Sequence, residues 1–315
     1  MVSLRIVFFG TPEFAVPTLR RLLSSSHTVC GVVTQPDRPR GRGHHVTHAP
    51  VKALAVDRGL PLLQPPRLRD AAFVESLRAW APDLGVVAAY GKLIPEGIIT
   101  LPRLGMINVH ASLLPKYRGA APVHRAVIAG EPETGVTIMR VEKLLDAGAM
   151  LAKAQRQIGS GETSDLVERD LAELGADLLV KVVDQMATGP IAEEPQDPTR
   201  ATFAPRLTKD EGLIAWTLSA SDIHNRVRGL YPWPHAYTYL DGRRLIVLKT
   251  HVNERLTDAT PGAIVEVTHD AIHVAAGDHR LVTIDVVQPE GRRLMHVRDF
   301  LAGHALKAGA RFSGA

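Results

Sequence analysis

Along the first two-thirds of the chain, short apolar runs alternate with longer stretches in which apolar and polar residues are mixed. Short apolar runs that end at glycine or at polar residues are typical of strands buried on both faces of a parallel sheet. They predict strands at residues 4–9, 27–33, 61–63, 84–89, 106–110 and 135–141. The other stretches predict helices at residues 11–24, 51–58, 70–80, 93–99, 122–130 and 163–186. This alternation indicates a mainly parallel sheet with helices on both faces.

The pattern changes after residue 189. Residues 190–205 hold four prolines, three acidic residues and little that is apolar, which is the composition of a linker. The short apolar runs beyond it predict strands at residues 236–240, 245–250, 263–267, 272–275 and 281–287. Such spacing predicts a small antiparallel barrel or sandwich. We therefore expect a catalytic domain at 1–189, a linker at 190–205 and a smaller domain at 206–315.

Composition excludes few classes of protein but places the chain among ordinary globular ones. Hydrophobic residues make up 45% of the sequence and charged residues 22%, and the net charge of +4 allows a polyanionic partner without requiring one. Cys30 is the single cysteine, lies in an apolar run and is expected to be an inert core residue. Without a disulfide framework, a signal peptide or a membrane-spanning run, we expect a cytoplasmic protein that does not enter a membrane.

Two polar residues interrupt the strand predicted at residues 106–110. Asn108 and His110 stand two residues apart, so their side chains share one face of the strand. A buried amide and imidazole cost free energy unless they meet partners or a ligand. A loop follows at the carboxyl end of the strand, where ligands bind in open α/β sheets. Taken alone, this spacing is more often that of a satisfied core Asn and His.

Asp146 shifts the interpretation toward chemistry, because it follows the strand predicted at residues 135–141. Asn108, His110 and Asp146 supply an oxyanion donor, a general acid/base and a carboxylate that can hold the imidazole or accept a proton. No suitable Ser or Cys nucleophile accompanies them. We therefore expect direct transfer of a group between two bound substrates.

The residues around these three resemble the folate-dependent formyltransferases. The shared motifs are N-V-H-A-S-L-L-P-K-Y-R-G-A-A-P from Asn108, T-G-V-T-I-M from Thr134 and L-D-A-G from Leu145. Further matches are I-V-F-F-G-T-P-E-F-A at Ile6, T-Q-P-D-R-P-R-G-R-G at Thr34 and W-P-H-A-Y at Trp233. The resemblance covers most of the chain. It implies a Rossmann-like first domain and a C-terminal β-barrel of the OB type, a fold often used on nucleic acid.

The resemblance also implies a reaction, in which 10-formyltetrahydrofolate is the formyl-donor substrate and no metal takes part. Asn108, His110 and Asp146 would be catalytic. The residues implied in folate binding are Ser112, Leu113, Leu114 and Pro115. The expected acceptor is the α-amino group of methionine on initiator tRNA, which gives N-formylmethionyl-tRNA for translation initiation. The alternative within the family is a small amine, such as a purine intermediate or an amino-sugar nucleotide.

Residues 35–48 are rich in Pro, Gly, Arg and His, have no hydrophobic period and predict an exposed loop. From composition alone, a solvated connection and a phosphate-contacting loop both remain open. Given the resemblance, we expect Arg42 to bind tRNA, with Arg38 and Arg40 as further contacts. This loop and the added C-terminal domain favour a tRNA acceptor over a small amine.

Other functions have weaker support from the sequence. The strand that ends at Gly10 and the helix start predicted at Thr11 invite a dinucleotide-binding hypothesis, but the further glycines of G-x-G-x-x-G are missing. Retention of the three site residues argues against a non-catalytic RNA-binding protein. The residues that raise the option of a metal site are His44, His45 and His48, but no Cys or carboxylate set completes it. Trp216, Trp233 and Tyr237 are expected in core or interdomain packing, and the protein is expected to be a monomer.

Overall fold

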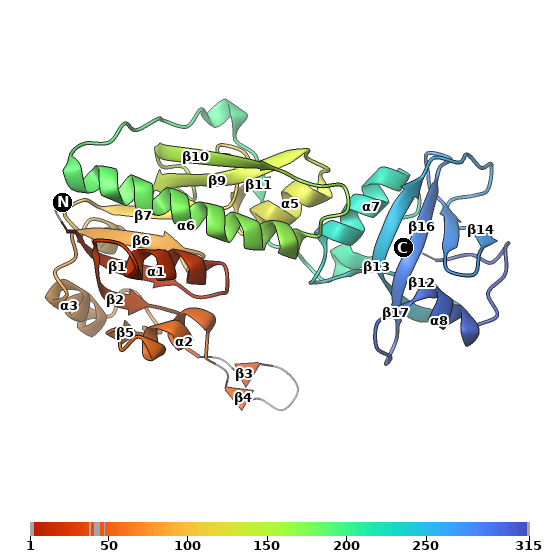
Figure 1. Ribbon diagram of the computed structural model, residues 1–315, viewed down its shortest axis with the longest axis horizontal. Helices are drawn as coiled ribbons and strands as arrows, with labels where there is room; N and C mark the ends of the chain where they lie inside the picture. The colour runs from red at the N-terminus through yellow and green to blue at the C-terminus, as the bar shows by residue number, and fades with distance from the viewer. Residues whose placement is uncertain (1–2, 38, 41–44, 47, 314–315) are drawn as a thin grey trace. The chain divides into compact units, whose positions relative to one another are not determined.

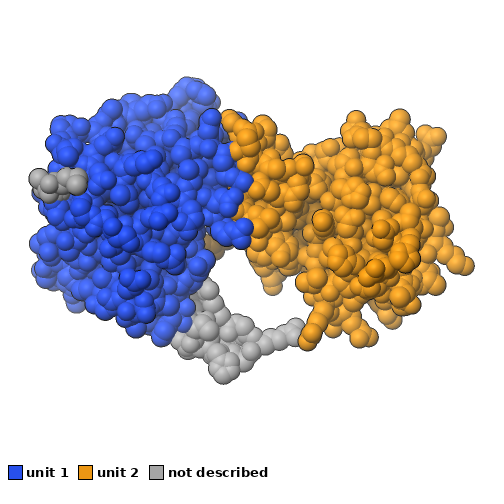
Figure 2. All heavy atoms as spheres, in the orientation of Figure 1, with its two compact units in different colours: residues 1–122, 134–156, 168–204 blue, residues 123–133, 157–167, 205–315 orange. Residues whose placement is uncertain are grey.

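The computed structural model describes residues 3–37, 39–40, 45–46 and 48–313 of the 315-residue chain. The chain divides into two compact units, which are coloured separately in Figure 2. Unit 1 comprises residues 1–122, 134–156 and 168–204, and unit 2 comprises residues 123–133, 157–167 and 205–315. Two short segments of the predicted catalytic domain, residues 123–133 and 157–167, are thus part of unit 2.

Unit 1 is built on a seven-stranded sheet with the strand order β10-β9-β7-β6-β1-β2-β5 (Figure 1). Its strands are β1 (Arg5–Gly10), β2 (Thr28–Val33), β5 (Leu62–Leu63), β6 (Leu84–Ala88), β7 (Met106–His110), β9 (Glu133–Arg140) and β10 (Met150–Gln157). Strands β5, β2, β1, β6 and β7 run parallel, whereas β9 is antiparallel to β7. The predicted mainly parallel sheet is confirmed.

Helices cover both faces of this sheet. They are α1 (Ala15–Leu23), α2 (Pro50–Asp57), α3 (Ala71–Ala79), α4 (Glu96–Ile99) and α6 (Ser164–Thr188). Helices α1 and α6 lie side by side, and Arg21 of α1 forms an ion pair with Asp177 of α6 at 2.7 Å (Figure 1). A separate apolar cluster joins Phe73 of α3 and Ile98 of α4 to the sheet residue Val7. The core of unit 1 therefore lies in two layers, one on each side of the sheet.

The start of α1 differs from the prediction. The helix begins at Ala15, and Thr11 does not cap it. The Thr11 hydroxyl instead donates a hydrogen bond to the Tyr90 carbonyl at 3.3 Å and accepts one from the Gln35 amide at 3.3 Å. Thr11 thus joins the loops after β1, β2 and β6, which meet at the carboxyl edge of the sheet.

Strand β10 was not predicted, and the region expected to be a loop contains a short ribbon. Residues 150–157 alternate between more and less buried positions and form the edge strand of the sheet. In the predicted loop, β3 (Pro39–Arg40) pairs antiparallel with β4 (His45–Val46).

The segment after α6 returns along unit 1 and makes backbone contacts with it. Met150 and Glu194 exchange backbone hydrogen bonds of 2.8 and 2.9 Å. A short 3-10 helix, η1, spans Pro198–Arg200, and β11 (Phe203–Ala204) then pairs parallel with β8 (Arg118–Gly119).

Unit 2 contains an antiparallel sheet with the strand order β12-β13-β16-β15-β14, and β17 pairs with β16 (Figure 1). Its strands are β12 (Ala236–Leu240), β13 (Arg243–Asn253), β14 (Ile264–Val267), β15 (Ile272–Ala275), β16 (Leu281–Pro289) and β17 (Met295–His296). Its helical elements are α5 (Pro122–Ile128), η2 (Asp210–Gly212), α7 (Ala220–Gly229) and α8 (Val297–Ala302), and the first turn of α6 also belongs to it. The predicted smaller C-terminal β domain is confirmed.

The aromatic residues of unit 2 divide between core and surface. Trp216 is buried, stacks on Phe312 and donates a hydrogen bond to the Thr238 hydroxyl at 3.1 Å, as expected of a core residue. Trp233 is 47% exposed, so the expectation of core packing is wrong for it within this unit. Tyr237 is half-buried, with the Arg244 guanidinium 4.0 Å above its ring.

Candidate active site

Strand β7 places Asn108 and His110 on the same face of the sheet. Between them, Val109 points to the opposite face, where a Cβ on Gly175 of α6 would lie only 2.7 Å from it. His110 is 5% exposed, and Asn108 is half-buried. Within the described part of the chain, the side-chain amide of Asn108 has no hydrogen-bond partner. Its N–H donors are therefore free to meet a ligand, as an oxyanion site requires.

The hydrogen bonds of His110 determine which ring nitrogen carries the proton. Its Nε2 lies 3.0 Å from the Tyr117 carbonyl oxygen, which can only accept, so Nε2 donates. In the neutral ring, Nδ1 is left with its lone pair. This Nδ1 lies 3.7 Å from Oδ2 of Asp146, beyond direct hydrogen-bond distance. Two proton acceptors thus face one another, an arrangement that can take up one proton.

Asp146 lies in the connection between β9 and β10, with its backbone in the left-handed region at φ 49°. Its side chain is 12% exposed, and its Oδ2 accepts a hydrogen bond from the Gly119 amide at 2.8 Å. The structure therefore brings His110 and Asp146 together from separate elements. Asn108 stands two residues from His110 on the same strand face.

The predicted folate-binding loop follows β7 directly. Its members Ser112, Leu114 and Pro115 are buried, and Leu113 is partly exposed. The Ser112 hydroxyl donates to the Lys116 carbonyl at 2.7 Å. Thr137 of β9 holds the same loop by donating to the Ser112 carbonyl and accepting from the Leu114 amide. A ligand at this loop would meet Leu113 and the backbone rather than the Ser112 donor.

Two residues of this region, Gln196 and Arg118, were missed by the sequence analysis. Gln196 donates through Nε2 to the backbone carbonyls of Asp146 and Gly148, at 2.9 and 2.8 Å. Its Oε1 accepts two hydrogen bonds from the Arg118 guanidinium, at 3.0 and 2.7 Å. Nothing in the Pro-rich sequence around Gln196 distinguishes it from a solvated linker residue.

The predicted tRNA-binding arginines cannot be placed. Arg38 and Arg42 lie outside the described residues, as does the side chain of Arg40, although the Arg40 backbone belongs to β3. His44 and the side chain of His45 lie outside them as well.

The base of the same loop is described. Asp37 forms an ion pair with Lys52 and accepts a hydrogen bond from Gln64 at 3.2 Å. Nδ1 of His48 lies 3.6 Å from the same carboxylate. The hydrogen bond from Lys52 is the main cause that lowers the pKa of Asp37. Both ends of the loop are thus joined through one carboxylate.

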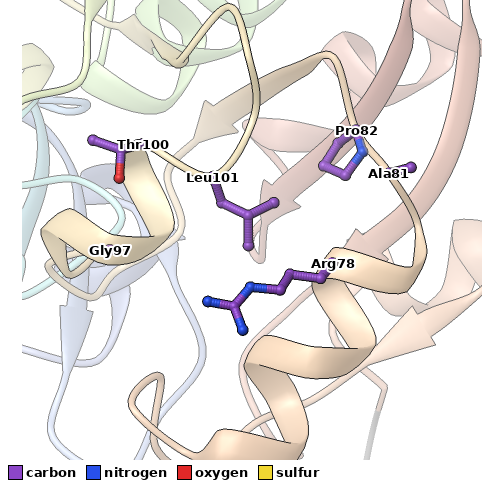
Figure 3. A pocket seen from close by; sticks show the side chains of 6 residues that line it. All are labelled: Arg78, Ala81, Pro82, Gly97, Thr100 and Leu101. Atoms are coloured by element: carbon purple, nitrogen blue, oxygen red, sulfur yellow. The ribbon is translucent and has the colours of Figure 1, made fainter.

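A shallow hollow of about 390 Å³ lies at the other end of the sheet strands (Figure 3). Its lining residues are Arg78, Ala81, Pro82, Gly97, Thr100 and Leu101. Ala81 and Pro82 precede β6, whereas the candidate site follows the carboxyl end of β7. The Arg78 guanidinium is paired with Glu75 at 2.5 Å. We assign no chemistry to this hollow.

The described residues contain neither a metal-ligand cluster nor a membrane-spanning helix. No group of three or more His, Cys, Asp or Glu side chains there is arranged to hold a metal ion. No helix in the same part of the chain is long and apolar enough to cross a membrane.

Comparison with known protein families gives two matches. The formyl transferase family matches residues 4–183, and the formyl transferase C-terminal domain matches residues 206–305. The methionyl-tRNA formyltransferase of Methylococcus capsulatus is 46% identical over 308 residues, which covers 98% of this chain and 99% of that one. The enzyme of the same name from Geobacter sulfurreducens is 43% identical over 315 residues, covering 100% and 98%.

Solved structures of lower identity share the fold. An N-formyltransferase of Helicobacter canadensis, in complex with folinic acid and dTDP-3-aminofucose, aligns with a TM-score of 0.68 at 14% identity, over 89% of this chain and 98% of that one. HypX of Aquifex aeolicus in complex with tetrahydrofolic acid aligns with a TM-score of 0.64 at 17% identity, over 95% and 47%. The two family matches and the full-length relatives show that the chain belongs to the formyl transferases, and within them to the methionyl-tRNA formyltransferase family.

Proposed function

We propose that this protein transfers the formyl group of 10-formyltetrahydrofolate to the α-amino group of methionine on initiator tRNA. The observation that carries this proposal is the similarity to methionyl-tRNA formyltransferases over the whole chain, at 43–46% identity for the two relatives above. Formylation of a small amine is the alternative. The full-length match, including the C-terminal domain, favours the tRNA.

Asn108 is proposed to stabilise the charge that develops on the formyl oxygen. As the amine nitrogen adds to the formyl carbon, that oxygen gains negative charge, and a preorganised N–H donor lowers the barrier. The Asn108 amide is half-buried and has no partner within the described residues, so it fits this role. No covalent enzyme intermediate is needed, because both substrates are bound together.

His110 and Asp146 are proposed to handle the protons. The attacking amine must lose a proton, and the departing folate nitrogen must gain one. His110 Nδ1 and Asp146 Oδ2, 3.7 Å apart, form a pair that can take up the first proton and return it. The Gly119 amide and the Tyr117 carbonyl hold the two side chains in place.

The binding assignments extend this proposal to both substrates. The loop proposed to bind folate is Ser112, Leu113, Leu114 and Pro115, through its backbone and the partly exposed Leu113. Residues 1–189 would hold the catalytic site, residues 190–205 would link the domains, and residues 206–315 would bind tRNA as an OB-type barrel. A cytoplasmic monomer fits such a translation enzyme.

Formyl transfer itself tests the function directly. The protein is incubated with labelled 10-formyltetrahydrofolate and with methionyl-initiator tRNA, methionyl-elongator tRNA or a set of small amines in separate reactions. We expect label on the initiator at a rate far above that on the other acceptors. Label on a sugar nucleotide or purine intermediate with none on tRNA would establish the alternative.

The proposed tRNA contacts predict a separate pattern. The resemblance implies that the first base pair of the initiator acceptor stem is not a Watson–Crick match and is therefore weak. Arg42, between Gly41 and Gly43, is proposed to read this terminal pair, because a guanidinium can pair with phosphate and stack on an unpaired base. Arg42→Ala should lower kcat/KM on the initiator far more than on a variant with a strong terminal pair. Arg38→Ala and Arg40→Ala should weaken both and flatten the salt dependence. Wild-type behaviour of Arg42→Ala on both tRNAs would contradict the assignment.

A further inference from the structure

Residues 193–204, here named the strap, are attached to unit 1 on both sides of the Asp146 loop. At its start, Glu194 pairs with Met150, the first residue of β10. At its end, β11 pairs with β8, so the Ala204 carbonyl accepts from the Ala120 amide at 2.9 Å. On unit 1, the strap thus binds β8 at residues 118–120 and β10 at Met150, and Asp146 lies between these two points along the chain.

Gln196 is drawn inward from an otherwise exposed part of the strap. Between residues 192 and 200 it alone is partly buried, and its neighbours on both sides are exposed. Its amide nitrogen donates to the carbonyls of Asp146 and Gly148, and its amide oxygen accepts twice from Arg118. All four hydrogen-bonding positions of the side-chain amide are used.

These contacts act on a loop that needs external support. The backbone of Asp146 is left-handed, a conformation that costs free energy for a residue with a Cβ. At Gly148 the chain passes so close to Arg140 that a Cβ would lie 2.1 Å from the Arg140 carbonyl oxygen. Arg118, which holds Gln196, directly precedes Gly119, whose amide binds the Asp146 carboxylate. Gln196 thus binds the backbone of Asp146, and the β8 backbone binds its carboxylate.

We propose that Gln196 is a positioning residue for formyl transfer, which fixes the Asp146 carboxylate opposite His110 through the loop backbone and Arg118. It rests on the catalytic role proposed for Asp146. No other neutral side chain of this length both donates twice and accepts twice. Glutamate would lose both donors and place negative charge beside two carbonyl oxygens. Methionine would keep the length and lose every hydrogen bond.

The test compares Gln196→Glu and Gln196→Met with a matched control, Glu193→Gln. Glu193 lies on the same strap and binds Arg140 through two hydrogen bonds of 2.8 and 2.7 Å, but among the described residues its side chain forms no hydrogen bond or ion pair with the Asp146 loop. Initial rates with methionyl-tRNA and 10-formyltetrahydrofolate are measured from about pH 5 to 9. Thermal melting of each variant is recorded alongside.

For both Gln196 variants, kcat should fall between about tenfold and a hundredfold, because a misplaced catalytic group loses its alignment. The KM for tRNA should change less than about threefold. The pH–rate profile should change together with kcat, because the displaced carboxylate no longer faces Nδ1 of His110 as the proton is moved. Glu193→Gln should keep the wild-type kcat and profile. Arg118→Lys cannot make both hydrogen bonds to Gln196, so its kcat should lie between that of the Gln196 variants and that of the wild type.

Three results would overturn the inference. One is an unchanged kcat in Gln196→Met, and another is a loss of kcat with an unmoved pH profile. The third is an equal loss in Glu193→Gln, which would make the strap merely structural. If the Gln196 variants fail to fold, Arg118→Lys decides the question by the same profile. Absence of transfer by the wild-type protein would instead refute the proposed function.

Discussion

Asn108 and His110 share a strand face but differ in what holds them. His110 is tied through Nε2 to the Tyr117 carbonyl, whereas the Asn108 amide has no partner among the described residues. A half-buried amide without a partner costs stability unless a ligand uses it. The contrast agrees with a fixed imidazole and an amide that is kept for the reacting oxygen.

Replacing Asn108 by Ala should therefore lower kcat by about a hundredfold to a thousandfold, as does the loss of other oxyanion donors. The KM for tRNA should change little, because the lost interaction strengthens only in the transition state. Single-turnover measurement with saturating substrates separates the chemical step from binding. Asn108→Asp, which keeps the shape but removes the donor, should be at least as slow. A rate above a tenth of wild type in the Ala variant would contradict the role.

At the scale of single residues, the sequence supported Asn108 and His110 through their spacing of two, and Asp146 through its place after a strand. Gln196 could not be found this way, because its proposed role depends on contacts with Arg118 and the Asp146 loop, far away in sequence. The helix start predicted at Thr11 was wrong for the same reason. A carbonyl of the β6 loop binds the hydroxyl that was expected to start the helix.

The connection between β9 and β10 is the element that sets the position of Asp146. Gly148 is buried and lies against the Arg140 backbone. A Cβ there would meet a carbonyl oxygen at 2.1 Å and a carbonyl carbon at 2.9 Å, and backbone atoms cannot move aside as a flexible side chain can. The connection must therefore shift as a whole if residue 148 carries a side chain.

Gly148→Ala should destabilise the protein by roughly 1–3 kcal/mol, as overpacking does. It should also lower kcat by about tenfold or more, because the shift moves Asp146 away from His110. Urea denaturation and initial rates measure the two effects. Gly97→Ala is the matched control, because a Cβ at Gly97 of α4 meets nothing within 4 Å. It should keep wild-type kcat and change stability by less than about 0.5 kcal/mol. Equal behaviour of the two variants would contradict this account.

Among the elements, the buried parallel strands were predictable because their apolar runs stand out. Strand β10 was not predictable, because its sequence M-L-A-K-A-Q-R-Q contains no β-branched residue and its second half is mostly polar. An edge strand of this kind is decided by its pairing with neighbours rather than by its own propensity. The ends of the strap are attached in the same way, by backbone pairing of Glu194 and of β11.

At the scale of the whole molecule, distant contacts decide which segments belong to which unit. Within unit 2, Arg125 forms an ion pair with Glu211, and Ser164 donates to the Gly229 carbonyl at 2.8 Å. Arg228 reaches the Gly159 carbonyl at 3.1 Å. These contacts attach residues 123–133 and 157–167 to the C-terminal part of the chain. No local pattern in either segment signals this.

The two units also differ in which groups burial and bonding perturb. In unit 2, burial is the main cause that lowers the pKa of four histidines: His124, His224, His235 and His273. In unit 1, the lowered pKa values belong to carboxyls such as Asp37, through its bond from Lys52. Burial alone would raise the pKa of Asp83. The hydrogen bonds from the Arg5 amide and the Arg103 side chain outweigh burial, so the pKa of Asp83 is lowered.

These shifts predict that mild acid weakens unit 2 first. An unfolded histidine binds a proton as the pH falls through about 6.5, whereas these folded ones resist it, so the free energy of unfolding falls below that pH. Carboxyls with lowered pKa values lose their contribution only below about pH 4. Between pH 7.5 and 5.5, strands β13 and β16 should lose about tenfold or more in hydrogen-exchange protection, corrected for intrinsic rates. Strands β1 and β6 of unit 1 should lose much less.

His224 offers the control for this last prediction. Its Nε2 donates to the Ser160 carbonyl at 2.8 Å, and its Nδ1 accepts from the Thr250 hydroxyl at 3.0 Å, so the neutral ring satisfies both partners. A proton on Nδ1 would remove that acceptor. Gln at this position keeps a donor and an acceptor but does not titrate. His224→Gln should therefore reduce the loss of protection in unit 2 on going from pH 7.5 to 5.5. An equal loss in β1 and β13, or no effect of the Gln variant, would show that these histidines do not control acid stability.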